Sequence, residues 1–275
     1  MVEFNNNSTV YTSSFTSWQE SVPRVLDAAG LISRLDPEKK IIIKPNLVEP
    51  QNPPITTPVE LIEALVDYIH ASYPGLEIII GEGCGSSSND TWQIFEALGY
   101  NRLANRSNVD LMDLNDAPLV QKQNSKCKRW PEMHLPKVIF ESFLISVPVL
   151  KAHSLAGVTL TMKNMIGLAP PSHYQQGGHW KKASFHQGIQ EAVYDLNRYR
   201  TPDFTLLDAT VGMQEAHLWG PICDPPPNRL AAGYDPVAID SYGCRLLGVN
   251  WKTVGHLTMA HDTLGTADPI TVSEI

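Results

Sequence analysis

The sequence contains little cysteine and no closely spaced cysteine pair. Four cysteines occur among the 275 residues, and they lie far apart at Cys84, Cys127, Cys223 and Cys244. Because ferredoxin-type clusters and zinc ribbons are held by Cys-x-x-Cys units, this spacing excludes both motifs. Scattered thiols are typical of a protein whose cysteines stay reduced, so we expect a cytoplasmic location.

The chain also lacks an excess of basic residues and any long apolar run. It has 21 Lys and Arg against 29 Asp and Glu, a formal net charge of -8 and a pI near 5.6. This balance argues against a nucleic-acid-binding surface. No apolar run could span a bilayer, and the opening MVEFNNNSTVY lacks the basic and apolar regions of a signal peptide. We therefore expect neither nucleic acid nor membrane as a partner, and the oligomeric state stays open.

What the sequence does contain is an alternation of strands and helices. KIIIKP at 40–45 and LEIII at 76–80 are short isoleucine runs, as in strands that are buried on both faces. Helices are predicted from Thr57, over 90–98, over 185–199 and from Asp235 to Leu247. This order predicts an α/β fold with a mainly parallel sheet flanked by helices.

Details of several elements are also predicted. Further strands are expected at 109–114, 137–140, 143–150 and 203–207, the last ending at Asp208. Pro148 should close its strand, because proline cannot donate to a sheet. Thr57 and Glu60 form a capping-box pattern at a helix start. We expect one domain over 1–275, with a division into two α/β lobes near the polar segment 115–134 as the alternative.

Polar side chains follow the predicted strands at the points where these end. In open parallel sheets, ligands bind outside the carboxyl ends of the strands, so these side chains mark a candidate site. They are Lys44 and Asn46, Glu82, Lys151 and His153, and Asp208. The inference requires that the strands belong to one sheet.

The segment 147–167 reverses the acidic character of the chain. It contains Lys151, His153, Lys163 and Asn164 and no acidic residue. Such a concentration of cationic and hydrogen-bonding groups suits a small anionic ligand. The alternative is that the lysines lie on a solvated face and the histidine belongs to a loop.

Alternating glycines follow the second isoleucine strand. Gly81, Gly83 and Gly85 match neither the Gly-x-Gly-x-x-Gly fingerprint nor a P-loop. Glycines between a strand and a helix often only permit a tight turn, and we favour that role here. Glu82 would repel an anion at this loop unless it binds a metal or is protonated.

Carboxylates and histidines leave a metal site open. Asp240 lies among apolar residues of a predicted helix, so its charge needs a lysine or a metal ion as partner. Asp208 and His186 are the other candidate metal ligands, with His173 and His179 nearby in sequence. Their spacing matches no compact motif such as His-Glu-x-x-His. A divalent metal is therefore an open expectation, and its identity is not specified.

Taken together, the motifs resemble the family known as domain of unknown function 362. The resemblance covers about residues 38–265, in the order of the family. The matching residues are Lys44-Pro45-Asn46-Leu47, Gly81-Glu82-Gly83, Leu150-Lys151-Ala152-His153, Val158-Thr159, Lys163-Asn164, Gly167, His186, Leu207-Asp208, Asp235-Pro236-Val237-Ala238 and Asp240. The resemblance implies a shared site at these positions, but no settled activity. Many relatives carry ferredoxin-like cysteine motifs, which are missing here.

Two functional hypotheses remain. In the first, an enzyme or binding protein holds a small anionic substrate or cofactor with Lys44, Asn46, Lys151, Lys163 and Asn164. His153 is its general acid or base, because the ordinary pKa of histidine lies near neutrality. In the second, a non-catalytic metal-binding or iron–sulfur-related partner protein uses its histidine-rich loop. Lysine is a poor metal ligand, so the clustering of lysines at the ends of the predicted strands favours the first hypothesis.

Overall fold

The computed structural model describes residues 8–275. Residues 1–7, which belong to the opening segment MVEFNNNSTVY that lacks the features of a signal peptide, lie outside the described residues. Its strands are β1 (Thr9–Ser14), β2 (Ile41–Pro45), β3 (Ile78–Glu82), β4 (Val109–Asp113), β5 (Leu119–Gln123), β6 (Glu132–Pro136), β7 (Phe143–Val147), β8 (Val149–His153), β9 (Gly157–Thr159), β10 (Phe204–Met213), β11 (Arg229–Gly233) and β12 (Thr271–Glu274). Its α-helices are α1 (Trp18–Ala29), α2 (Val59–Ser72), α3 (Thr91–Ala97), α4 (Val138–Glu141), α5 (Thr161–Asn164), α6 (Pro171–Tyr174), α7 (Ile189–Tyr199), α8 (Pro236–Leu246) and α9 (Gly255–Ala260).

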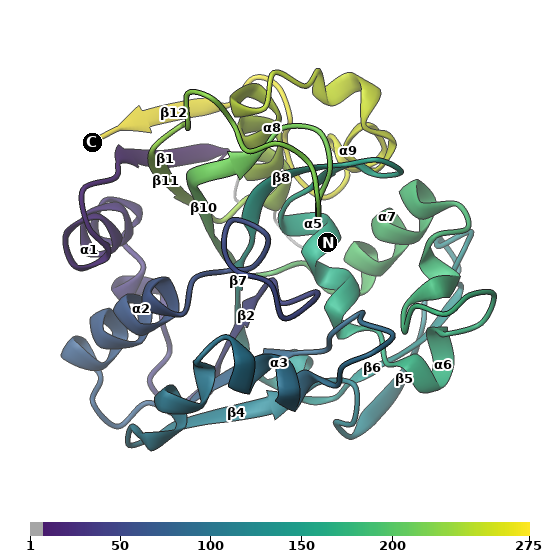
Figure 1. Ribbon diagram of the computed structural model, residues 1–275, viewed down its shortest axis with the longest axis horizontal. Helices are drawn as coiled ribbons and strands as arrows, with labels where there is room; N and C mark the ends of the chain where they lie inside the picture. The colour runs from purple at the N-terminus through teal and green to yellow at the C-terminus, as the bar shows by residue number, and fades with distance from the viewer. Residues whose placement is uncertain (1–7) are drawn as a thin grey trace.

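Within residues 8–275, ten strands form one sheet in the order β12-β1-β11-β10-β7-β2-β3-β4, with β8 beside β10 and β9 beside β8. The strands β4, β3, β2, β7 and β10 pair in parallel, whereas β11 runs antiparallel to both β10 and β1. Helices surround this sheet (Figure 1). The structure thus confirms the predicted α/β fold with a mainly parallel sheet.

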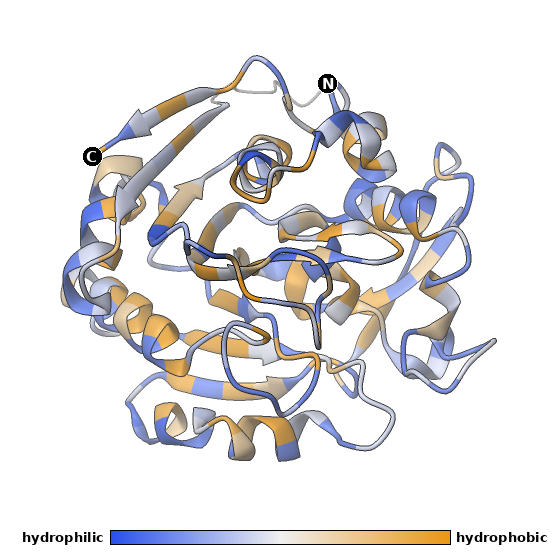
Figure 2. Cartoon of the chain, turned by 45° about the horizontal axis from the view of Figure 1, so that its top comes forward, coloured by the Kyte–Doolittle hydropathy of each residue, from blue (hydrophilic) through white to orange (hydrophobic). Residues whose placement is uncertain are grey.

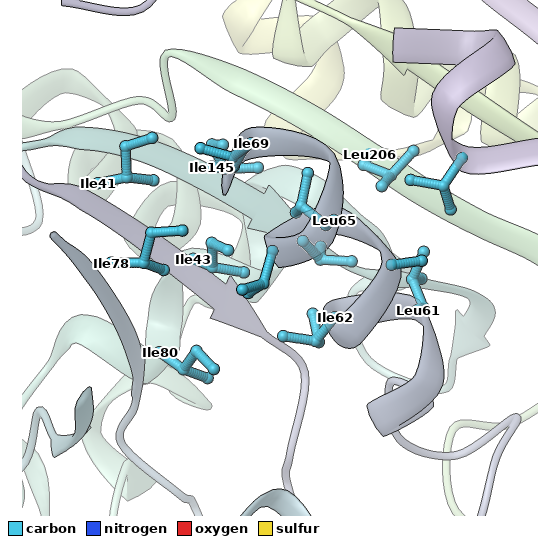
Figure 3. Packing of buried hydrophobic residues seen from close by; sticks show 14 of the residues in the cluster. Ile41, Ile43, Leu61, Ile62, Leu65, Ile69, Ile78, Ile80, Ile145 and Leu206 are labelled. Carbon is cyan, nitrogen blue, oxygen red and sulfur yellow. The ribbon is translucent and has the colours of Figure 1, made fainter. Parts of the chain in front are cut away.

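The central strand β2 serves two cores at once. All five of its residues are buried, and 41–43 pair in register with 78–80 of β3. Ile41 and Ile43 pack against α2 in one apolar cluster (Figure 3), while Ile42 packs in another with residues of α7. Figure 2 shows the corresponding concentration of apolar residues on the strands and on the inner sides of the helices. Burial on both faces explains the unbroken isoleucine run.

One predicted helix cap is confirmed and another is wrong. Asp235 caps α8 by accepting hydrogen bonds from the first amides of the helix, as its position before a proline predicts. Thr57 does not cap α2, because Pro58 is the N-cap residue and makes no side-chain cap. The Thr57 hydroxyl instead donates to the Val147 carbonyl at 2.7 Å and accepts from the Asn46 amide at 2.8 Å. It therefore ties the loop after β2 to the end of β7.

Other boundaries also differ from the sequence prediction. Of the strand expected at 137–140, residues 138–140 fall in the short helix α4, because a brief apolar run does not distinguish helix from strand. The run 143–150 is interrupted at Pro148, which separates β7 from β8. The strand expected to end at Asp208 continues as β10 to Met213. Segment 115–134 contributes β5 and most of β6, which pair with each other in a separate two-stranded sheet.

All four cysteines are buried, and none forms a disulfide bond. They are Cys84, Cys127, Cys223 and Cys244. Burial raises the pKa of Cys127 to about 11, so this thiol stays protonated at neutral pH.

None of the helices in residues 8–275 has the length and hydropathy needed to cross a bilayer.

The cluster around β2 gives a direct test of the core. Ile62 of α2 is fully buried, and Ile62→Ala should lower the free energy of unfolding by about 2–5 kcal/mol, because it leaves a cavity. Urea unfolding measures the change. The matched control is Ile222→Ala, at a side chain that is 56% exposed, with an expected change within about 0.5 kcal/mol. Equal losses in both variants would contradict the core assignment.

Candidate functional site

A cavity of about 490 Å³ is lined by residues that follow or end β2, β3 and β8. The turn from β9 through α5 and the loops around 177–186 and 217–219 complete its wall. Of the residues expected at the site, those in the wall are Lys44, Asn46, Glu82, Gly83, Lys151, His153, Lys163, Asn164 and His186. Of the four strand ends at which the sequence predicted site residues, three therefore contribute to one cavity, and the one at Asp208 does not.

Three expected site residues do not line this cavity. A side chain at Gly81 would meet Leu114 at 3.3 Å, so this glycine faces the neighbouring core. Asp208 lies within β10, where its Oδ1 accepts from the Thr210 amide at 2.9 Å and hydroxyl at 2.7 Å. Asp240 lies on α8, fully buried. The structure therefore gives the two aspartates structural partners away from the wall.

Asp240 holds the short helix that carries two site residues. Its carboxylate accepts from the backbone amides of Thr161 at 2.7 Å and Met162 at 2.9 Å. These are the first residues of α5, which ends with Lys163 and Asn164. Burial raises the pKa of Asp240 to about 8, against the effect of the two amides. The expected lysine or metal partner is replaced by backbone N–H groups.

Lys44 and Glu82 form a buried ion pair at the ends of β2 and β3. The Lys44 Nζ lies 2.8 and 2.9 Å from the two oxygens of Glu82, and both side chains are at most 4% exposed. Glu82 also accepts from the amides of Leu47 at 3.0 Å and Gly83 at 2.8 Å. Burial lowers the pKa of Lys44, and the carboxylate opposes this effect. Glu82 is therefore neutralised within the protein rather than repelling a ligand.

Glycines enclose this pair because no side chain would fit. A Cβ added at Gly167 would collide with the Glu82 carboxylate and would lie 2.6 Å from the Lys44 Nζ. A Cβ at Gly83 would collide with the Gly167 carbonyl and lie 2.6 Å from the Asn115 Oδ1. The absence of side chains at Gly83 and Gly167 thus allows the backbone to pack closely around the ion pair, whereas Gly81 lies within strand β3 rather than in a turn.

The other lysines of the wall have no carboxylate partner. Lys151 is 1% exposed and donates to the Ile55 carbonyl at 2.6 Å, and burial, with Lys163 as a second cause, lowers its pKa well below the usual range. Lys182 donates to the Asn115 Oδ1 and the Ala169 carbonyl, and burial lowers its pKa to about 7. Burial, with Lys44 as a second cause, lowers the pKa of Lys163 to about 8.

The wall therefore has an excess of groups that can carry positive charge. Glu82 is the one carboxylate among the described wall residues, and Lys44 already pairs with it. Lys151, Lys163 and Lys182 remain without a counter-charge in the wall. A bound anion would supply that charge, and it would raise the pKa of the lysines that pair with it.

Two stacked imidazoles lie in the wall as neutral groups. The amides of Leu155 and Ala156 both donate to the Nδ1 of His153 at 3.1 Å, so its proton resides on Nε2. Burial, with Lys163 as a further cause, lowers the pKa of His153 far below its ordinary value. The ring stacks on His217 at 4.0 Å between centroids, and burial lowers the pKa of His217 to about 3. His153 is therefore a neutral hydrogen-bond donor.

Two buried oxygens of the wall lack a hydrogen-bond partner among residues 8–275. They are the Oγ1 of Thr159, in a residue 3% exposed, and the Oδ1 of Asn46, in a residue 9% exposed. Buried polar atoms are nearly always paired, because leaving one unpaired costs about 1–3 kcal/mol. Both residues line the cavity.

Some wall residues gave no signal in the sequence. Lys182 and His217 belong to polar loops without periodicity, and their residue types are the only feature that could have indicated a site. Trp180 and Trp219 are 39% and 76% exposed and lie at the same cavity. Indole rings at a cavity mouth add an apolar surface beside the cationic interior.

The proposed metal ligands are not assembled as a set. His186 lies in the cavity wall, whereas Asp208 and Asp240 do not. His173 stacks on His134 at 4.1 Å, and His179 is exposed. Across the part of the chain that the structure describes, no three His, Cys, Asp or Glu side chains come together as metal ligands would.

Comparison with known proteins gives a family and a similar fold. The family model described as Domain of unknown function (DUF362) matches residues 41–245, and no curated protein matches this sequence. A similar solved structure is the lactate racemase apoprotein from Thermoanaerobacterium thermosaccharolyticum, with 15% sequence identity and a TM-score of 0.51. The match covers 86% of this chain and 56% of that chain, so this chain spans little more than half of that protein's length. At this identity, the likeness shows the fold alone.

The buried ion pair can be tested by removing one charge at a time. Glu82→Gln leaves the Lys44 ammonium buried without its counter-charge and should lower the free energy of unfolding by about 3–5 kcal/mol. Lys44→Met should be similarly costly, but the double variant should lose less than the sum, because no buried charge remains.

Urea unfolding of the four proteins measures this coupling. The control is Lys40→Met, which breaks an ion pair with Glu77 in which both side chains are more than half exposed. Its effect should be at most about 1 kcal/mol. Strictly additive losses at Lys44 and Glu82 would show that the pair is not coupled.

Proposed function

The chain belongs to the family described as domain of unknown function (DUF362), and we propose that it binds and acts on a small organic anion in this cavity. The observation that carries the proposal is the charge imbalance of the wall. Lys151, Lys163 and Lys182 lie around one cavity, while Glu82 is already paired with Lys44. Removing lysines from water is costly, and an anionic ligand offsets that cost.

In this proposal, the residues of the cavity wall bind different groups of the ligand. Lys163 and Lys182, when protonated, attract a carboxylate or phosphate group of the ligand. The unpaired oxygens of Thr159 and Asn46 take further polar groups of the ligand. The Nε2–H of His153 donates a hydrogen bond to an oxygen of the ligand, because its other nitrogen is occupied by backbone amides.

The size and rim of the cavity narrow the ligand further. A volume of about 490 Å³ is in the range of cavities that hold small organic molecules. Trp180 and Trp219 place apolar rings beside the lysines, so the ligand combines an anionic group with a less polar part. The similar structure is named a lactate racemase, and lactate is a small carboxylate of this kind. The proposal rests on the cavity, since that likeness concerns the fold.

Anion binding should stabilise the protein against heat. With a small carboxylate at about 100 times its Kd, the expected gain is about 2.7 kcal/mol, which raises Tm by roughly 5 °C or more. Lys182→Met should lose most of this ligand-induced rise, because it removes an ammonium from the cavity wall. Differential scanning fluorimetry compares the shift with and without ligand in each protein.

The matched control is Lys137→Met, which removes an exposed lysine outside the cavity wall and should keep the full rise. The comparison uses the ligand-induced shift alone, so a change in the basal Tm of either variant does not affect it. Equal rises in the two variants would contradict a role of Lys182 in binding.

Binding should also weaken as the pH rises. Lys182 and Lys163 have pKa values lowered to about 7 and about 8, so they are cationic below these values and neutral above them. Affinity for sulfate, whose charge is constant from about pH 6 to about pH 9, should fall at least about tenfold over this range. Calorimetric titration measures it. Lysines with ordinary pKa values near 10.4 would leave the affinity flat, which would argue against the proposed site.

A further inference from the structure

Lys163 differs from the other lysines of the cavity in having no acceptor. Lys44 is held by Glu82, Lys151 by the Ile55 carbonyl, and Lys182 by oxygens of neighbouring residues. No hydrogen bond of the Lys163 Nζ occurs within residues 8–275, although it lines the cavity and is partly exposed there. An ammonium that serves only to balance charge or fix a loop would be held by an oxygen, as the other three are.

The backbone that carries this side chain is fixed from both sides. The carboxylate of Asp240 holds the first amides of α5. Asn164, the last residue of α5, accepts from the Lys44 Nζ at 3.2 Å and donates to the Ser146 hydroxyl at 3.1 Å. The Lys163 amine therefore has no hydrogen-bond partner of its own among the described residues, while the backbone that carries it is held rigidly. A reactive group that must be positioned for a reaction requires such a rigid support.

The surroundings keep a part of this amine unprotonated. Its pKa is lowered to about 8 by burial and by the nearby Lys44 ammonium, so a substantial fraction is neutral near pH 7.5. His153 and His217, which line the same cavity, are neutral rings and provide no negative charge to hold an ammonium. Burial and a neighbouring cationic group are two of the ways in which proteins activate a lysine as a nucleophile.

We propose that the Nζ of Lys163 forms a Schiff base with the carbonyl carbon of a small oxo acid bound in the cavity. This inference rests on the proposed function, because the carboxylate of the oxo acid is the anion that the other lysines attract. The Nε2–H of His153 is a donor for the carbonyl oxygen, and the unpaired hydroxyl of Thr159 is a second polar group for the ligand.

The step balances without an oxidant or reductant. The nitrogen lone pair forms the C–N bond, and the π pair of the carbonyl moves to its oxygen. That oxygen leaves as water with one hydrogen from the amine and one proton from solvent, which reaches the cavity at its exposed rim near His186. The product is an iminium ion that keeps the second hydrogen of the amine. Its positive charge replaces that of the lysine, so the anionic group stays paired.

Reductive trapping tests this step. The full chain is incubated with 2-oxobutanoate and sodium cyanoborohydride, digested and mapped by mass spectrometry. Lys163 should be alkylated at least about tenfold faster than the exposed Lys137. The reason is that an unprotonated amine next to the carbonyl group of a bound oxo acid reacts faster than an exposed amine that meets the oxo acid only by diffusion. Lys163→Arg keeps the positive charge and should show no rapid labelling. The saturated analogue 2-hydroxybutanoate, which has the same carboxylate and no carbonyl, should protect Lys163.

A binding measurement without reductant separates this inference from the proposed function. If both acids raise Tm in the wild-type protein and no adduct forms on Lys163, the Schiff base is overturned and anion binding stands. If neither acid raises Tm and no adduct forms, both proposals are overturned for this class of ligand. Rapid labelling of Lys182 with Lys163 unmodified would also overturn the assignment. Labelling confined to Lys163 and lost in Lys163→Arg supports it.

Discussion

The site depends on one ammonium and one carboxylate that share the buried end of two neighbouring parallel strands. Lys44 is the second-last residue of β2 and Glu82 is the last residue of β3, and neither charge could be buried alone without a cost of several kcal/mol. Their mutual contact and the amides of Leu47 and Gly83 offset that cost. Because the remaining space is so small, only glycine fits at position 167. The glycine at position 167 and the close approach of its backbone are therefore consequences of one electrostatic requirement.

With this pair neutral, the character of the cavity is determined by the groups around it. Lys151, Lys163 and Lys182 all have lowered pKa values, chiefly because of burial. A protein selected for stability alone would place such residues in water, where their charge costs nothing. Buried groups with shifted pKa values in one cavity, next to unpaired polar oxygens, are typical of a site that is completed by a ligand.

The parts of the structure that follow from local pattern could be predicted from the sequence. The isoleucine runs predicted β2 and β3, and the rule of strand ends predicted Lys44, Glu82, Lys151 and His153 as neighbours. The same rule failed for Asp208, because β10 continues past it with an irregular register against β8. The contribution of Lys182 comes from a loop whose path depends on tertiary packing, so no periodic pattern in the sequence indicates it.

The link from Asp240 to α5 has a consequence for how the chain acquires its site. Asp240 is 79 residues from Thr161, and Lys44 is 120 residues from Asn164, so the contacts that organise the cavity are remote in sequence. Contacts of such separation form late, because the loops between them must close first. A chain still emerging from the ribosome can form the early βα units, yet it has no fixed α5 until α8 has been synthesised. Competence to bind a ligand would thus appear abruptly, near the end of folding, and would report completion of the whole sheet.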